Sequence, residues 1–210
     1  KGIGITLLVT ALSLVMGMII GFIVSLVRSA HDQQSPDRKK NPILGIFNGI
    51  CHVYLTVIRG TPVVVQLMIM YYIVMVSSTN KILVATIAFG MNSGAYVAEI
   101  FRSGIMSIDN GQFEAGRSLG FNFVQTMQYI IIPQAFKNVL PALANEFIVL
   151  LKETSVSGYV ALQDLTKGGD IIRSRTYSAF MPLIAVAIIY LVIVMFFSKL
   201  VAILERRLRN

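Results

Sequence analysis

One uncharged apolar run, residues 3–27, constrains most strongly where this chain can fold. An α-helix rises about 1.5 Å per residue, so a helix of this run is long enough to cross the hydrocarbon core of a bilayer, which is about 30 Å thick. The run is too long for the apolar region of a secretory signal, and no small-residue cleavage site precedes the next charges. We therefore predict that it spans a membrane.

Further apolar runs follow the first, in a chain of which 55% of the residues are hydrophobic and only 13% are charged. That balance lies outside the usual range of soluble proteins. We predict an all-α integral membrane protein with about five spans in one transmembrane domain, residues 1–210. The expected spans are residues 3–27, 52–76, 82–103, 134–160 and 178–201, with a polar segment at residues 104–133.

Basic residues lie between the apolar runs and predict the orientation of the chain. The loop after the first run is rich in them, with Arg28, Arg38, Lys39 and Lys40, whereas the loop after the second run carries only Lys81. By the positive-inside rule the first loop is cytoplasmic. An odd number of spans then places the N-terminus outside, the segment 104–133 inside and the C-terminus inside.

The rest of the basic residues agree in part with this orientation. The C-terminal tail supports it through Arg206, Arg207 and Arg209, whereas the predicted outer connection runs against it through Lys167, Arg173 and Arg175. The net charge of +8 is distributed between spans and not gathered on one polar patch, which argues against nucleic acid as a partner.

The second predicted span contains a polar break, "RGTP" at residues 59–62, with Gln66 one turn further on. A proline here removes a backbone donor and bends or restarts the helix, and the freed backbone groups need partners from protein or water. Such breaks are typical of helices beside a cavity. The alternative is a helix that begins only at Pro62, with Arg59 reaching back to the lipid headgroups.

Polar residues share one face of the third predicted span. Asn92, Tyr96 and Glu99 follow one another at helical spacing, and Ser103 lies one turn further on. A polar stripe is not expected to face lipid, so we predict that it lines a path. Two alternatives remain open: Glu99 pairs with Arg102, and Asn92 joins neighbouring helices through hydrogen bonds.

Glu146 is the most costly residue of the fourth predicted span. If that span rises from near Gln134, Glu146 lies about 18 Å further along, close to the middle of the membrane. A charged side chain there costs a few kcal/mol on insertion scales and by default marks a substrate path or a site. Lys152 and Glu153 lie near the outer end of this span. For these two residues the alternative to a role in a site is that their charges only neutralise each other.

Nothing in the sequence supports catalysis by this chain. It has no glycine-rich phosphate loop, no paired-histidine zinc motif and no nucleophile elbow. His31 and His52 are interpreted as non-catalytic, and the lone Cys51 excludes an intrachain disulfide. We predict a chain that is not an enzyme and that binds no metal or cofactor.

The polar segment carries a motif at fixed spacing. Its residues are Glu114, Ala115 and Gly116, then after three positions Gly120, and after nine more Ile130, Ile132 and Pro133. The pattern resembles the EAA signature of ABC importer permeases, with Gly116 in place of an alanine and Ile132 in place of a leucine. The stretches "RGTPVVVQLMIMYY", "NSGAYVAEIFRSGIMSIDNGQFEA" and "PQAFKNVLPALANEF" are similar to the polar amino acid uptake subfamily, which serves histidine, glutamine, glutamate, arginine and opines.

The local chemistry of the motif predicts two short helices on the cytoplasmic side. Residues 112–119 form the first, Gly120 ends it with a positive φ, and Asn122 caps a second that runs to Tyr129. The resemblance implies that the first is a coupling helix seated in a cleft of an ATP-binding subunit. It also implies the type I ABC importer fold, like that of the methionine permease. The expected docking residues are Glu114, Ala115, Gly116, Arg117 and Gly120.

The resemblance further implies the partners and location of the chain. Two ABC ATP-binding subunits would bind ATP and Mg, and a second permease copy or a homologous permease would complete the pathway. An extracytoplasmic solute-binding protein, separate or fused upstream of Lys1, would deliver the substrate. The expected location is the bacterial cytoplasmic membrane, with the lipid bilayer around the spans.

We expect the substrate to be an amino acid, and the sequence leaves its identity open. The expected binding residues are Asn92, Glu146, Tyr96, Glu99 and Gln66. Glu146 would hold a cationic or α-amino group, and Asn92 the carboxylate or a polar side-chain group. The alternative function is a secondary transporter or channel without an ATPase, which predicts an internal repeat and no docking segment.

Overall fold

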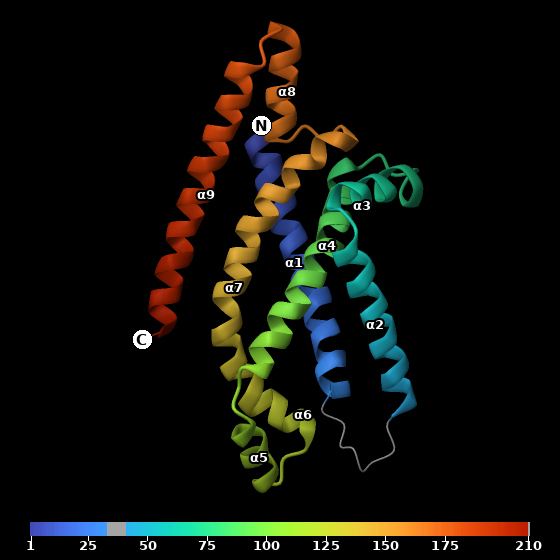
Figure 1. Cartoon of the computed structure of the whole chain (residues 1–210), viewed down its shortest axis with the longest axis vertical. Coiled ribbons are helices and arrows are strands. Elements are labelled where there is room, and N and C mark those ends of the chain that lie inside the picture. Colours follow the sequence, from blue (N-terminus) through green and yellow to red (C-terminus); the bar gives the residue numbers. More distant parts are fainter. Residues whose placement is uncertain (33–40, 210) are drawn as a thin grey trace.

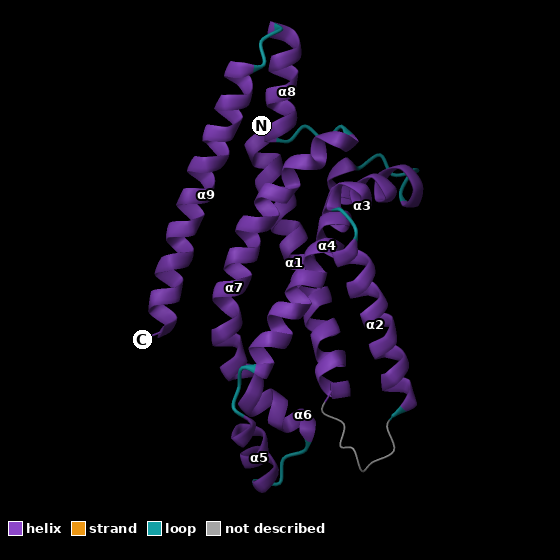
Figure 2. Ribbon diagram, in the orientation of Figure 1, coloured by secondary structure: helices purple, strands orange, loops and turns teal. Residues whose placement is uncertain are grey.

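A computed structural model describes residues 1–32 and 41–209 of the chain, and these residues form helices and connecting turns without any strand (Figure 2). The α-helices are α1 (Gly2–Asp32), α2 (Pro42–Gly60), α3 (Val63–Ile69), α4 (Lys81–Met106), α5 (Asn110–Ser118), α6 (Phe123–Thr126), α7 (Ile132–Glu153), α8 (Leu165–Thr176) and α9 (Phe180–Arg209). Two π-helical turns follow α3 and α6, at Met70–Val74 and Met127–Ile131, and a 3₁₀ turn, Thr154–Val160, follows α7. Arg38, Lys39 and Lys40, which contributed to the predicted orientation, lie outside the described residues.

Within the described residues, four helices are long and apolar enough to cross a membrane, namely α1, α2, α4 and α9. Each of them overlaps one of the predicted spans, although α2 shares only residues 52–60 with the span predicted at residues 52–76. The remaining predicted span contains α7, which is 22 residues long and is not in this group. Its length is sufficient, but Lys137, Asn145 and Glu146 lower its hydropathy.

α1 and α4 pack side by side through the middle of the bundle and α7 packs against α4, while α9 lies along α7 (Figure 1). Small residues allow this close approach. A Cβ atom on Gly21 of α1 would lie 2.6 Å from Val97 Cγ1 of α4, and one on Gly94 would lie 2.8 Å from the Tyr54 hydroxyl of α2. Asn92 and Ser93 of α4 are buried by its neighbours, whereas Tyr96 and Ser103 remain exposed, and α2 and α9 expose most of their apolar residues.

The predicted polar break separates α2 from α3. α2 begins earlier than the predicted span, at Pro42, because the Asn41 side chain accepts a hydrogen bond from the Ile43 N–H (3.1 Å) and caps the helix. It ends at Gly60, and Pro62 directly precedes α3. The alternative of a helix that begins only at Pro62 is wrong, because the residues before the break are themselves helical.

α5 and α6 lie at one end of the molecule, beyond the ends of α4 and α7 (Figure 1). Gly120 ends the α5 segment with φ +78°, and the Phe121 N–H returns to the Gly116 carbonyl (3.0 Å), as expected for a glycine C-cap. Asn122 and Gln125 form a capping box at the start of α6. These local predictions are confirmed, but the second helix does not stop at Tyr129: it continues through the π-helical turn into α7.

The opposite end of the molecule carries the 3₁₀ turn and the α8–α9 corner (Figure 1). Asp164 caps α8 by accepting from the Lys167 N–H (2.8 Å), and Asp170 accepts from Lys167 Nζ (2.8 Å) and Arg173 Nη2 (2.7 Å). The hydrogen bond from Lys167, followed by that from Arg173, holds the pKa of Asp170 below its ordinary value. Two of the cations that ran against the orientation rule are thus engaged by one carboxylate.

Candidate functional site

Buried polar side chains of α4 pair with a polar side chain of α3 and with one of α7 inside the bundle. α3 supplies Gln66, α4 supplies Asn92 and Ser93, and α7 supplies Glu146. Asn92, Ser93 and Glu146 have exposed fractions of 3%, 0% and 6%. Buried polar groups need partners, so their hydrogen bonds define what this site can do.

Gln66 joins the helix break to the face of α4. Its Nε2 donates to the carbonyls of Ile58 (2.7 Å) and Thr61 (3.0 Å) and lies 2.8 Å from Thr61 Oγ1. Its Oε1 accepts from Asn92 Nδ2 (3.0 Å). The break thus creates the free carbonyls that orient Gln66, and Gln66 in turn orients Asn92. The Oδ1 atom of Asn92 is buried without a hydrogen-bond partner among the described residues.

Glu146 projects from α7 toward α4. Its Oε1 accepts a hydrogen bond from Ser93 Oγ (2.9 Å). No ion pair within the described part of the chain includes Glu146. Ser93 was not among the residues predicted for the site. Its position beside Asn92 is its only signal in the sequence, since tertiary packing determines which helix it faces. The carboxylate and the free Asn92 Oδ1 are both hydrogen-bond acceptors, so the site suits a group rich in N–H donors.

Tyr96 and Glu99 belong to a separate charged cluster toward the α5 end of α4. Glu99 Oε1 lies 2.8 Å from Arg28 Nη1 of α1 and 3.7 Å from Arg59 Nη1 of α2. The Arg59 guanidinium lies 5.6 Å from the centroid of the Tyr96 ring, within cation–π range. The cluster joins α1, α2 and α4, and no hydrogen bond or ion pair in the described part of the chain links it to Asn92 or Glu146.

The alternative pairing of Glu99 with Arg102 is wrong. Arg102 Nη2 instead lies 3.0 Å from Asp32 Oδ2, at the end of α1. Glu99 faces Arg28 and Arg59 because α1 and α2 both pack near this turn of α4, which spacing along one helix could not show.

The motif residues of α5 divide into exposed and buried positions. Glu114, Ala115, Arg117 and Gly120 are exposed, whereas Gly116 is buried against Thr126 of α6. Apolar side chains beside them are also exposed, with Leu119 at 70% and Val124 at 66%. This end of the molecule therefore offers a mixed polar and apolar surface.

The fold and the site define a helical membrane protein with polar side chains buried between its spans and a short amphipathic helix beyond them. Residues 43–210 match the family model described as binding-protein-dependent transport system inner membrane component. The chain belongs to this family, which confirms the resemblance to importer permeases. It is 35% identical over 212 residues to a putative glutamine transport system permease protein of Rickettsia bellii, covering 99% of this chain and 91% of that protein.

Two solved structures share the fold. One is an amino acid ABC transporter with histidines, at TM-score 0.85 and 41% identity, covering 98% of this chain and 92% of the other. The second is an inward-facing methionine ABC transporter, at TM-score 0.83 and 19% identity, covering 99% of this chain and 94% of the other. The predicted all-α fold, like that of the methionine permease, is confirmed.

Proposed function

We propose that this chain is the membrane subunit of an ATP-driven importer of an amino acid. The observation that carries the proposal is Glu146, a buried carboxylate on a membrane helix whose hydrogen-bond partner is Ser93 and for which the described residues supply no counter-charge. An uncompensated carboxylate between membrane helices is costly and indicates a site for a passing cationic group. The named relative and the amino acid transporter structure support an amino acid as the cargo.

Glu146 binds the ammonium or a cationic side chain of the substrate in this proposal. Asn92 was expected to hold the carboxylate or a polar side-chain group of the substrate. Its free atom is Oδ1, an acceptor, while Nδ2 already donates to Gln66. Asn92 therefore fits an N–H group of the substrate better than its carboxylate. Glu146 and the free Asn92 Oδ1 are both acceptors, and such a pair on the substrate path favours a substrate with several N–H donors, such as an arginine-like or histidine-like side chain.

Tyr96 and Glu99 line the same path closer to the α5 end in this proposal. Glu99 is shared by Arg28 and Arg59 at 2.8 Å and 3.7 Å, so the cluster carries one more positive than negative charge. Arg59 is the more weakly held of the two cations. It offers a transient partner for the substrate carboxylate after the amino acid leaves Glu146.

α5 is the surface that meets the ATP-binding subunit. Glu114 and Arg117 are exposed on a helix that lies beyond the spans, and Leu119 adds an apolar contact. Gly116 acts indirectly, since it is buried against α6. ATP and Mg are bound and ATP is hydrolysed in that partner, and α5 transmits its closure to α4 and α7 as a rigid-body rocking of the bundle. A permease without an ATPase would leave this surface without a role.

The α5 end faces the cytoplasm and both the N-terminus and the α8–α9 corner face outward. Arg28, Lys137, Arg206 and Arg207 lie toward the α5 ends of their helices, which agrees with the positive-inside rule. A second permease copy or a homologue covers the exposed apolar faces in a bacterial cytoplasmic membrane, and a solute-binding protein approaches from outside.

Replacement of Glu146 by Gln tests the proposal. Glu146→Gln keeps the shape of the side chain and the Ser93 contact but removes the charge, so the apparent KM for uptake into proteoliposomes should rise roughly ten- to hundredfold, the value of a charge-assisted hydrogen bond. Glu153→Gln, on the same helix and near its end, is the matched control and should leave KM within about threefold. An unchanged KM in Glu146→Gln, with intact ATPase association, would remove Glu146 from the substrate path.

A further inference from the structure

A groove of about 760 Å³ opens between the first turns of α7 and the last turns of α9. The parts of α7 and α9 that line it are the parts nearest the α5 end of the bundle, and Glu146 and Ser93 are not among its lining residues. Its lining residues are Ile108, Pro133, Gln134, Lys137, Asn138, Pro141, Glu205 and Leu208. The groove therefore has charged and amide groups inside and apolar side chains among its walls.

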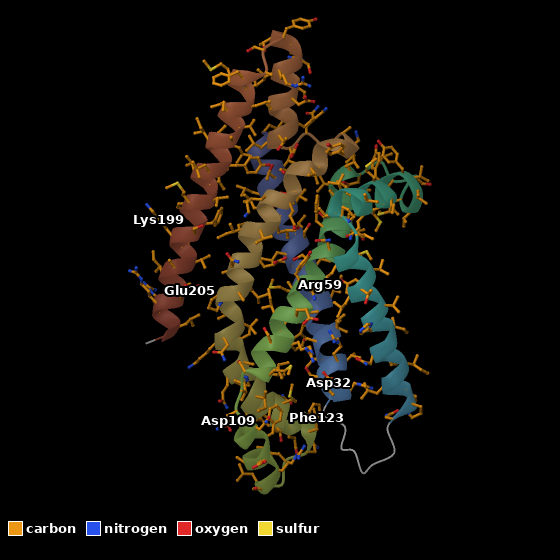
Figure 3. All side chains as sticks on the ribbon, viewed as in Figure 1. Asp32, Arg59, Asp109, Phe123, Lys199 and Glu205 are labelled. Atoms are coloured by element: carbon orange, nitrogen blue, oxygen red, sulfur yellow. The ribbon has the colours of Figure 1, made fainter. Side chains whose placement is uncertain are left out.

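The two charges of the groove come from opposite walls. Lys137 is on α7 and Glu205 is near the C-terminal end of α9 (Figure 3). Both are exposed, and neither takes part in an ion pair or a side-chain hydrogen bond with the side chains that the structure describes. A cation and a carboxylate that border one groove without meeting each other can hold a ligand that carries both charges.

The amides of the groove are tied to the motif segment. Gln134 Nε2 donates to Gln112 Oε1 of α5 (3.2 Å) and Asn138 Nδ2 donates to Ser107 Oγ (2.9 Å). Their amide nitrogens are thus engaged, while Lys137 Nζ remains the strong donor of the groove. A ligand seated here would bridge α7 and α9 beside the hydrogen bonds that join α7 to α5.

The surroundings of the groove point to a lipid. The lining residues Ile108, Pro133, Pro141 and Leu208 are apolar, so the flanks of the groove beside its two charges are apolar at the level where a membrane helix ends. A free amino acid carries the same pair of charges as a zwitterionic headgroup but brings no acyl chains to cover these flanks. A headgroup with a phosphate and a primary ammonium satisfies both charges, and its chains cover the apolar side chains.

We propose that the groove between α7 and α9 binds an ethanolamine phospholipid, with the phosphate at Lys137 and the ammonium at Glu205. A glycerol headgroup lacks the ammonium, so Glu205 disfavours it. A choline headgroup has the charge but no N–H to donate to the carboxylate. The site is thus selective for the headgroup and not merely for negative charge, and it does not depend on the proposed transport function.

Native mass spectrometry of the detergent-purified transporter complex tests the site. Phosphatidylethanolamine, phosphatidylglycerol and phosphatidylcholine with identical acyl chains are titrated separately. We expect phosphatidylethanolamine to be retained roughly two- to fivefold more than either other lipid, the range given by one exposed ion pair. Glu205→Gln should remove the preference for phosphatidylethanolamine over phosphatidylglycerol. Lys137→Gln should weaken retention of both of these lipids, because Lys137 contacts the phosphate that each of them carries.

Lys199→Gln is the matched control, because Lys199 is an exposed lysine of α9 that does not line the groove (Figure 3). Its lipid retention should equal that of the unmodified chain. Equal retention of the three lipids, or equal losses in Lys137→Gln and Lys199→Gln, would overturn the proposal. Displacement of bound phosphatidylethanolamine by millimolar free amino acid, abolished by Glu205→Gln, would assign the groove to a soluble zwitterion and would also overturn it.

Discussion

Gly116 makes room for Thr126 where α5 packs against α6. A Cβ atom at position 116 would lie 2.6 Å from Thr126 Cγ2 and 2.7 Å from Thr126 Oγ1, closer than non-bonded atoms approach. The motif that this segment resembles has an alanine at this position. The presence of glycine in place of alanine at position 116 is thus explained by Thr126. Glycine and threonine together fill the space that alanine and a smaller residue would fill.

Gly116→Ala should destabilise the α5–α6 contact by about 1–3 kcal/mol because the added methyl group overpacks it. Thr126→Ala in the same chain should recover most of that loss, since it removes both clashing atoms. The coupling energy from a double-mutant cycle of thermal unfolding in detergent measures this. Gly168→Ala is the control, because nothing lies within 4 Å of a Cβ there. Additive effects of the two changes would contradict the explanation.

Gln66 stabilises the break between α2 and α3 and orients Asn92 at the same time. Gln66→Leu leaves the Ile58 and Thr61 carbonyls without their donor, so we expect a loss of about 1–3 kcal/mol and a lower unfolding temperature. Val65→Leu, at an exposed neighbouring position, should leave the unfolding temperature unchanged. If Gln66→Leu melts like the unmodified chain, the break is held by other contacts.

At the scale of elements, the turn that ends α5 requires glycine because of its backbone conformation and not because neighbouring atoms leave no room for a side chain. Gly120 has φ +78°, and nothing lies within 4 Å of a Cβ there. A β-branched residue is poorly tolerated in this region, whereas asparagine enters it more readily. Gly120→Val should therefore reorient α5, lower substrate-stimulated ATP hydrolysis at least about tenfold and leave membrane insertion intact, while Gly120→Asn retains most activity. Equal activity of the two variants would show that this turn does not position α5.

α8 draws stability from an ionised Asp170. Its pKa lies below the ordinary value because Lys167 and Arg173 donate to it, so its stabilising effect is complete above the unfolded pKa, about 3.9, and is lost as the pH falls through the lower folded value. Asp170→Asn should speed amide hydrogen exchange in α8 relative to the unmodified chain near neutral pH. That difference should shrink as the pH falls below the unfolded pKa and vanish once Asp170 is protonated in the folded chain, with both proteins compared at each pH. A difference that persists in acid would point to a role other than ionisation.

At the scale of the whole molecule, the fold class could be predicted from the sequence, and the polar residues within the spans could be selected as candidates. Asn92 and Glu146 were selectable because an amide and a carboxylate in apolar runs are costly unless they have a role. The turn at Gly120 and the cap at Asn122 were predictable because they follow from local backbone chemistry.

Other features depend on which helices face each other, and spacing along one helix does not contain that information. Ser93 as the partner of Glu146, and Arg28 with Arg59 as the partners of Glu99, come from the packing of α1, α2 and α7 around α4. The early start of α2 could have been predicted from Asn41 and Pro42, which are a typical helix cap and first helical residue. The prediction instead followed the apolar run, which begins later. The groove between α7 and α9 joins residues far apart in the sequence and had no local signal.

The central claim is that ATP hydrolysis in a partner drives an amino acid past Glu146. The most direct test is uptake of a radiolabelled amino acid into proteoliposomes that contain the complex purified through a tag on this chain, with its solute-binding protein, and with ATP or a non-hydrolysable analogue supplied to the α5 side. We predict uptake with ATP alone, insensitive to collapse of ion gradients, in preparations that contain an ATP-binding subunit in equal number to this chain. Uptake that follows an imposed ion gradient and proceeds without ATP would contradict the account.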